Sequence, residues 1–181
     1  MTSPRAVALS LAGALAACGG AEPSDPPAAQ APASFVAFAR DFEGFESWAA
    51  FPLGPGTPAV GEIEGPRTVF ASRLPAPGEA ALPVGTKLVK VIGDGPVETR
   101  QVFAMAKRGG DYNAFGAKGW EWFELTRDAR GAVSVDWRGV SPPDGTAYGT
   151  NLRGGACNEC HVEQGAATDA VLTPGVAPTG R

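Results

Sequence analysis

The middle of the chain consists of short runs rich in β-branched, aromatic and other apolar residues, and each run ends in Gly, Pro, Asp or a charged residue. Runs of this length between turn residues are typical of β-strands. No long stretch with helical periodicity separates them, so neighbouring strands should pair antiparallel through short turns rather than form parallel βαβ units. The pattern predicts strands at 67–73, 85–93, 99–107, 119–126 and 132–138.

Helical spacing occurs at both ends of this β-rich region. The segment 34–51 carries Phe35, Phe38, Phe42 and Phe45, spaced 3, 4 and 3. This spacing places apolar side chains on one face of a helix, most simply for core packing. A second, short helix is expected over about 156–164. The predicted fold class is α+β, a mainly antiparallel β-sheet with an N-terminal helix and a short C-terminal helix.

The first residues have the features of an export signal. One basic residue, Arg5, precedes an apolar stretch at 6–17, which is too short to span a bilayer but fits a secretory signal. The stretch ends in LAACG, which resembles the bacterial lipobox, so Cys18 would be lipidated and become the mature N-terminus. The alternative is ordinary signal cleavage, with Cys18 incidental.

Three domains follow from this interpretation: a lipoprotein-type signal at 1–18, a Pro/Ala-rich tether at 19–33 and a cofactor-binding domain at 34–181. The tether has no large apolar side chain and is expected to be extended or disordered. We expect an exported protein on the periplasmic side, anchored to a membrane by lipid. Gly19 gives no inner-membrane retention signal of the usual kind, which favours the outer membrane.

Charge and the counts of cysteine and histidine exclude some classes of function and point to others. The net charge is -4 without a basic cluster, which argues against nucleic acid as a partner. Hydrophobic residues make up 44% of the chain, enough for a substantial core. There are 3 cysteines and 1 histidine, and two of the cysteines lie in one pentapeptide with the histidine.

That pentapeptide is C-N-E-C-H, from Cys157 to His161. C-x-x-C-H is the attachment motif of a c-type haem. Cys157 and Cys160 would form thioethers with the vinyl groups, and His161 would be the axial ligand of the iron. The expected cofactor is one covalent haem c.

Two other site types use C-x-x-C. A thioredoxin-like redox site expects a βαβ context, which the strand pattern does not show. A structural zinc site needs four ligands, and Cys157, Cys160 and His161 supply only three. Both are weaker interpretations than haem c.

The lack of a second histidine excludes ligation of the iron by two histidines of one chain. Met105 is the only methionine after Met1 and could be a sixth ligand, although core packing is the more common explanation for a mid-strand methionine. The position of the motif at the end of a β-rich domain favours an iron with an open or weakly bound position, which would suit small-molecule binding or redox catalysis. A ligand such as Met105 would instead suit an electron-transfer cytochrome.

Seven segments occur in the order found in the cytochrome P-460 and cytochrome c′-β family, and the chain resembles that family over most of 41–172. The segments are FEGFESW, RTVF, VGTKLVKV, VFAMAKR, GWEWFEL, CNECH and DAVLT. The resemblance implies an antiparallel β fold, a homodimer and a haem resting against the sheet. Cytochrome P-460 oxidises hydroxylamine, whereas cytochrome c′-β binds nitric oxide and similar gases. Either activity implies a small-molecule ligand, and the first also implies a redox partner protein.

Two upstream residues would distinguish these activities. The resemblance places a lysine that cross-links to the porphyrin at Lys90, while Lys87, on the opposite strand face, is the weaker candidate. The oxidising members use a carboxylate beside the bound substrate, for which Glu121 is the best candidate and Glu124 the lesser one. The alternative is that Lys90 and Glu121 both face solvent.

Overall fold

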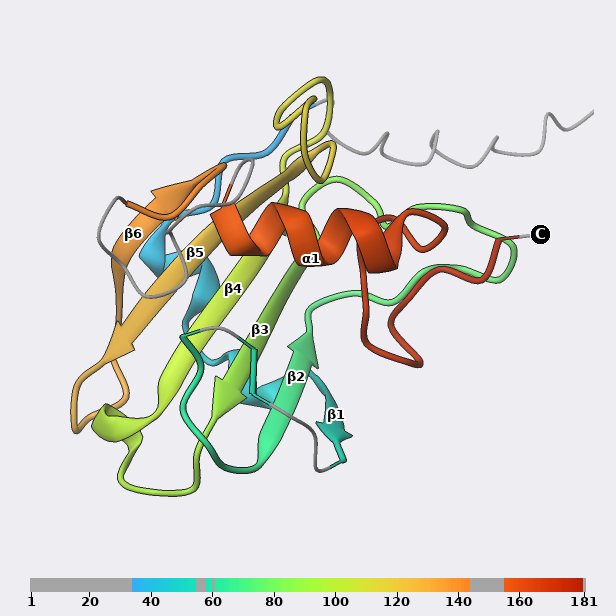
Figure 1. Ribbon diagram of the computed structural model, residues 1–181. Coiled ribbons are helices and arrows are strands. Elements are labelled where there is room, and N and C mark those ends of the chain that lie inside the picture. The colour runs from blue at the N-terminus through green and yellow to red at the C-terminus, as the bar shows by residue number, and fades with distance from the viewer. Residues whose placement is uncertain (1–33, 55–57, 60, 144–154, 181) are drawn as a thin grey trace, which may run out of the picture. The chain divides into compact units, whose positions relative to one another are not determined.

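The computed structural model describes residues 34–54, 58–59, 61–143 and 155–180. The predicted signal, with Cys18, and the tether lie outside the described residues. The described chain forms a six-stranded sheet in which each strand pairs antiparallel with the next along the sequence (Figure 1). The strands are β1 (Ala49–Leu53), β2 (Arg67–Ala71), β3 (Lys87–Ile92), β4 (Gln101–Lys107), β5 (Trp120–Arg127) and β6 (Val133–Gly139).

The five predicted strands correspond to β2 through β6, so the antiparallel β prediction is confirmed. The sixth strand, β1, was not expected, because its sequence AAFPL lies at the end of the predicted N-terminal helix. It pairs with β2 at one edge of the sheet, where a proline costs little because its missing N–H faces away from a neighbour. The short C-terminal helix is present as α1 (Gly155–Gly165).

The prediction of an N-terminal helix over 34–51 is wrong. The segment contains two single turns of 3₁₀ helix, η1 (Ala39–Phe42) and η2 (Phe45–Ser47), and then enters β1. Gly44 separates the turns in the left-handed conformation, with φ 65°, which an α-helix cannot include. A third 3₁₀ turn, η3 (Val97–Thr99), precedes β4.

The two faces of the sheet are defined by strand register. On one face Leu88, Met105 and Trp122 lie side by side across β3, β4 and β5. Figure 1 shows α1 crossing this face, and the chain after α1 packs here through Val171 and Val176. We call it the α1 face.

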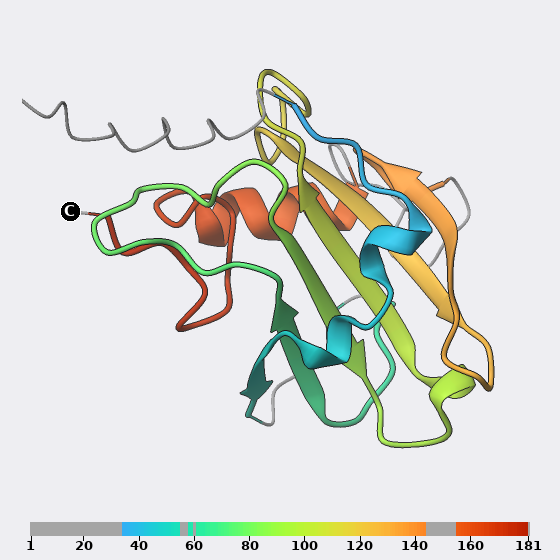
Figure 2. The same ribbon diagram turned by 180° about the vertical axis from the view of Figure 1, so that it is seen from behind.

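On the opposite face, Val89, Ala104 and Phe123 are neighbours in the same three strands. The N-terminal segment with η1 and η2 covers it, as Figure 2 shows, and contributes the fully buried Phe42 and Phe45. We call it the N-terminal face. The fold is therefore largely β, one sheet covered on both sides, with a single α-helix among the described residues.

In the part of the chain that the structure describes, no helix has the length and apolar character needed to cross a membrane.

Candidate cofactor site

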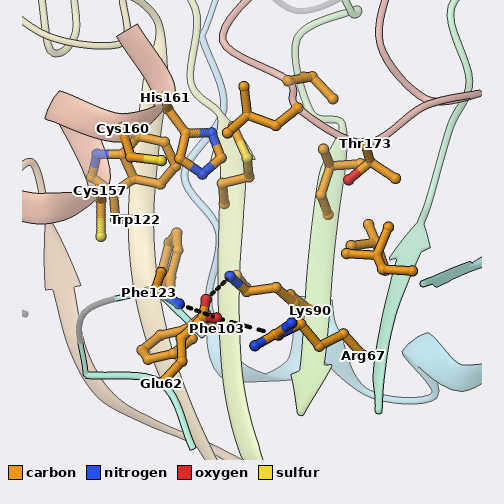
Figure 3. Close-up of a pocket in the computed structure, with 18 residues that line it drawn as sticks. Glu62, Arg67, Lys90, Phe103, Trp122, Phe123, Cys157, Cys160, His161 and Thr173 are labelled. Carbon is orange, nitrogen blue, oxygen red and sulfur yellow. Dashed lines mark hydrogen bonds and ion pairs between the residues drawn. The ribbon is translucent and has the colours of Figure 1, made fainter. Parts of the chain in front are cut away.

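A cavity of about 310 Å³ lies between α1 and the sheet (Figure 3). Cys157, Cys160 and His161 line it from α1. The sheet contributes apolar side chains that include Val69, Leu88, Phe103, Met105 and Trp122. The motif that the sequence singled out therefore opens into the cavity, which is within the usual volume range of ligand sites.

His161 is held in a defined position by two contacts. Its ring packs on the Trp122 indole, with ring centroids 4.7 Å apart. Its Nδ1 lies 2.7 Å from the carbonyl oxygen of Ala170, and because a carbonyl only accepts, Nδ1 must carry the proton. Nε2 is then the nitrogen with a free lone pair, and Figure 3 shows the ring among the residues that face the cavity.

Burial lowers the pKa of His161 to about 4, although the hydrogen bond to Ala170 opposes that shift. At neutral pH the imidazole is uncharged, which is the form that binds a metal. A histidine whose second nitrogen donates to a carbonyl is also the usual arrangement for a metal ligand, since that bond fixes the ring and raises its basicity.

The two cysteines are unpaired thiols. Burial raises the pKa of Cys157 to about 11, and burial also raises the pKa of Cys160. Redox-active C-x-x-C cysteines have the opposite property, a lowered pKa that makes the thiolate available. The surroundings of these thiols therefore do not favour thiol–disulfide exchange.

Asn158, inside the motif, fixes α1 to the sheet. Its Oδ1 accepts hydrogen bonds from the Trp122 indole at 2.9 Å and from the Ala117 N–H at 3.0 Å. Its amide group also exchanges hydrogen bonds with Asn113 and donates to the Val140 carbonyl at 2.9 Å. A buried amide with this many hydrogen-bond partners has a closely defined position. Asn158 therefore fixes the part of α1 that carries Cys157, Cys160 and His161.

The cavity also contains a charged group that the sequence did not indicate. Glu62, from the loop between β1 and β2, forms an ion pair with Lys90 and lies 3.4 Å from the Arg67 guanidinium. Its side chain is only 7% exposed, and all three residues line the cavity. Figure 3 shows the Glu62–Lys90 ion pair across the cavity from His161, beside the Phe103 ring.

The charge state of Glu62 follows from these contacts. Burial tends to raise its pKa, but the hydrogen bond and charge of Lys90, the Ala59 N–H and the charge of Arg67 together lower it below the ordinary value. Glu62 is therefore a carboxylate at neutral pH. No sequence signal marked it, because nothing distinguishes it from Glu64 in the segment GEIEG.

Glu121 is not at the cavity. Strand register places it beside Ala106, on the N-terminal face. There it is 3% exposed and binds Arg108 at 3.2 Å and Arg138 at 2.7 Å. The expectation that Glu121 faces the cofactor is not met, because Trp122, its neighbour in β5, takes that direction.

The other residues that the sequence raised are distributed over both faces. Lys90 and Met105 line the cavity. Glu124 is in register with Phe103 on the α1 face and accepts a hydrogen bond from the Trp137 indole at 2.9 Å. Lys87 lies on the N-terminal face beside the rings of Phe35 and Trp48.

These residues fit a c-type haem. Two thiols three positions apart on one helix, a histidine with Nε2 available, and an adjoining cavity lined largely by apolar side chains would together supply the attachment, the axial ligand and an apolar wall for the group. Within the described ranges, no three or more His, Cys, Asp or Glu side chains are grouped to hold a bare metal ion.

Comparison with protein-family models, with curated proteins and with solved structures gives no significant match for this chain.

Proposed function

We propose that the chain is a monohaem c-type cytochrome of the cytochrome P-460 and c′-β kind, exported and anchored to a membrane through Cys18. Cys157 and Cys160 hold the haem, and His161 is its axial ligand. One observation carries the proposal: His161 Nδ1 is bound to the Ala170 carbonyl while the ring and both thiols line one cavity. The arrangement leaves Nε2 as the only histidine nitrogen able to bind iron.

When bound, haem would supply a redox-active iron that His161 would hold and that would have a position available to a small ligand. The chain's own residues decide what that position can do. Apolar side chains such as Leu88 and Phe103 form much of the cavity wall. Glu62 and Lys90 add one carboxylate and one ammonium group that can exchange protons and hydrogen bonds with a small ligand.

This polar pair supports redox chemistry or binding of a small nitrogen species such as hydroxylamine or nitric oxide. In the oxidising version, Glu62 replaces Glu121 as the proton acceptor. Its carboxylate is ionised at neutral pH, as an acceptor must be, because Lys90 and Arg67 lower its pKa. The cross-link of Lys90 to the haem stays a prediction.

Met105 supports a second candidate, an electron-transfer cytochrome. It lines the same cavity and is only 6% exposed, so its thioether is protected from solvent. A low-spin spectrum with a methionine-to-iron signal would favour this candidate. A high-spin haem c spectrum would favour gas binding, and a strongly red-shifted ferrous Soret band would indicate the Lys90 cross-link.

The proposal is tested with the protein matured in a bacterial periplasm with cytochrome c assembly factors. The wild type should retain haem after acid–acetone extraction, and the Cys157→Ala, Cys160→Ala double variant should lose it. A Cys18→Ala variant behind a cleavable export signal is the control and should retain haem. Covalent haem in the double variant would contradict the attachment site.

A further inference from the structure

The turn that follows α1 has an unusual backbone. Asp169 and Ala170 both have positive φ, 54° and 59°, although neither is glycine. A non-glycine residue in this region is uncommon, and a strained backbone of this kind persists only where its surroundings enforce it. Two consecutive residues of this kind occur at the point where the chain supplies the carbonyl that binds His161.

Asp169 is the residue whose contacts enforce the turn. Its Oδ2 accepts a hydrogen bond from the Leu82 N–H at 2.9 Å, and its other carboxylate oxygen pairs with Lys107. The Asp169 carbonyl accepts from the Trp120 indole at 2.8 Å. Three separate segments of the chain therefore hold one residue, and both charged side chains of the ion pair are about nine-tenths buried.

The other side of the turn is fixed by the end of α1. The Ala170 N–H donates to the Gly165 carbonyl at 2.8 Å. A Cβ at Gly165 would come within 2.8 Å of the Ala170 Cα, so only glycine permits this approach. The Ala170 carbonyl is thereby directed at His161 Nδ1.

We infer that Asp169 is a positioning residue for the axial histidine: by holding the turn, it keeps the Ala170 carbonyl on His161 Nδ1. The inference rests on the proposed haem function. The bond from Nδ1–H makes the imidazole a stronger donor at Nε2, and outer hydrogen bonds of this kind tune the iron that a histidine binds. Asp169 therefore acts on the iron through the backbone, without touching it.

The experiment compares the holo-protein with three variants by resonance Raman spectroscopy and redox titration. Asp169→Ala should lower the iron–histidine stretching frequency and raise the reduction potential, because a weaker bond to Nδ1 leaves a less basic imidazole. Asp169→Asn keeps one acceptor for Leu82 and tolerates positive φ, so its values should fall between those of the wild type and Asp169→Ala. Asp128→Ala is the matched control: it removes the carboxylate that accepts hydrogen bonds from the Arg130 and Ala132 N–H groups in the exposed turn between β5 and β6, and it should leave both readouts unchanged.

If Asp169→Ala does not fold, Lys107→Met gives a second route, since it removes the partner of the same carboxylate. It should shift both readouts in the same direction. Covalently bound haem with unchanged frequency and potential in Asp169→Ala, or in Lys107→Met where only that variant folds, would overturn the positioning role alone. Absence of covalent haem from the wild type would overturn the proposed function instead.

Discussion

The two faces of the sheet are covered by different kinds of structure. On the N-terminal face, Phe42 and Phe123 pack edge to face with ring centroids 5.0 Å apart and are almost completely buried. The charge of Glu121 is balanced there by two arginines. On the α1 face the sheet and helix leave a cavity of about 310 Å³, with the Glu62 ion pair in its wall.

This difference separates the residues that stabilise the sheet from those that form the site. Tight aromatic contacts and neutralised charge on the N-terminal face add stability and leave little for a ligand to bind. On the α1 face, the cavity takes the place of packing contacts between α1 and the sheet. The strained backbone at Asp169 and Ala170 is on this face too. Strain and incomplete filling of this kind concentrate at functional sites.

The largest expected effect comes from Phe42→Ala. The side chain is fully buried against Phe123, so its loss should lower the free energy of unfolding by about 3–5 kcal/mol. Phe103→Ala, on the partly buried cavity wall, is the matched change and should cost clearly less. Urea denaturation measures both, and equal losses would contradict the assignment of stability to the N-terminal face.

Glu121→Gln should have the next largest effect. It removes the carboxylate that two arginines share, and should lower the free energy of unfolding by about 1–3 kcal/mol, because the guanidinium groups keep partial contact with water. The spectrum of the bound haem should not change, since Glu121 is on the other face. A spectral change in Glu121→Gln, with none in Glu62→Gln, would reverse the assignment of the two carboxylates.

The smallest expected effect is a pH dependence from Glu62. Its folded pKa lies below the unfolded value of 4.5, so ionised Glu62 stabilises the fold fully at pH well above 4.5. That contribution is lost as the pH falls through the folded pKa. The difference in free energy of unfolding between wild type and Glu62→Gln should therefore be constant near neutral pH and shrink below 4.5. A difference that grew in acid would contradict the lowered pKa.

The sequence allowed prediction of most of the sheet and of the motif on α1. Short apolar runs between turn residues predict strands directly, and β2 to β6 are found where expected. The prediction of an N-terminal helix was wrong because two 3₁₀ turns, one on each side of Gly44, bury Phe42 and Phe45 as effectively as one helix face would. Helical spacing of phenylalanines does not distinguish these two arrangements.

The side-chain directions in β5 could not be predicted for a related reason. The strand is buried on both faces, so alternation in WEWFEL does not say which residues face the cavity. Both Glu121 and Trp122 are buried, and only the register with β4 shows that Trp122 reaches His161. The direction of Glu121, away from the cavity, therefore could not be read from the alternation in this strand.

No local sequence pattern indicated the roles of Glu62 and Asp169. Glu62 reaches the cavity because its loop is attached to the start of β4, where Gln101 bonds the backbone at Gly61 and Ile63. Asp169 is defined by partners distant in sequence, Leu82 and Lys107 among them. Roles that depend on such long-range contacts become visible only in the folded chain.

The central claim is that Cys157, Cys160 and His161 hold a covalent haem in the cavity of the α1 face. The most direct test is the intact mass of the mature protein after denaturation, together with the absorption spectrum of its pyridine complex. The mature protein should have the mass of the processed, lipidated chain plus one haem, and its pyridine complex should give the spectrum of a haem joined by two thioethers. A protein that matures with both thiols free and no added mass, beside a control cytochrome that acquires its haem in the same cells, would contradict it.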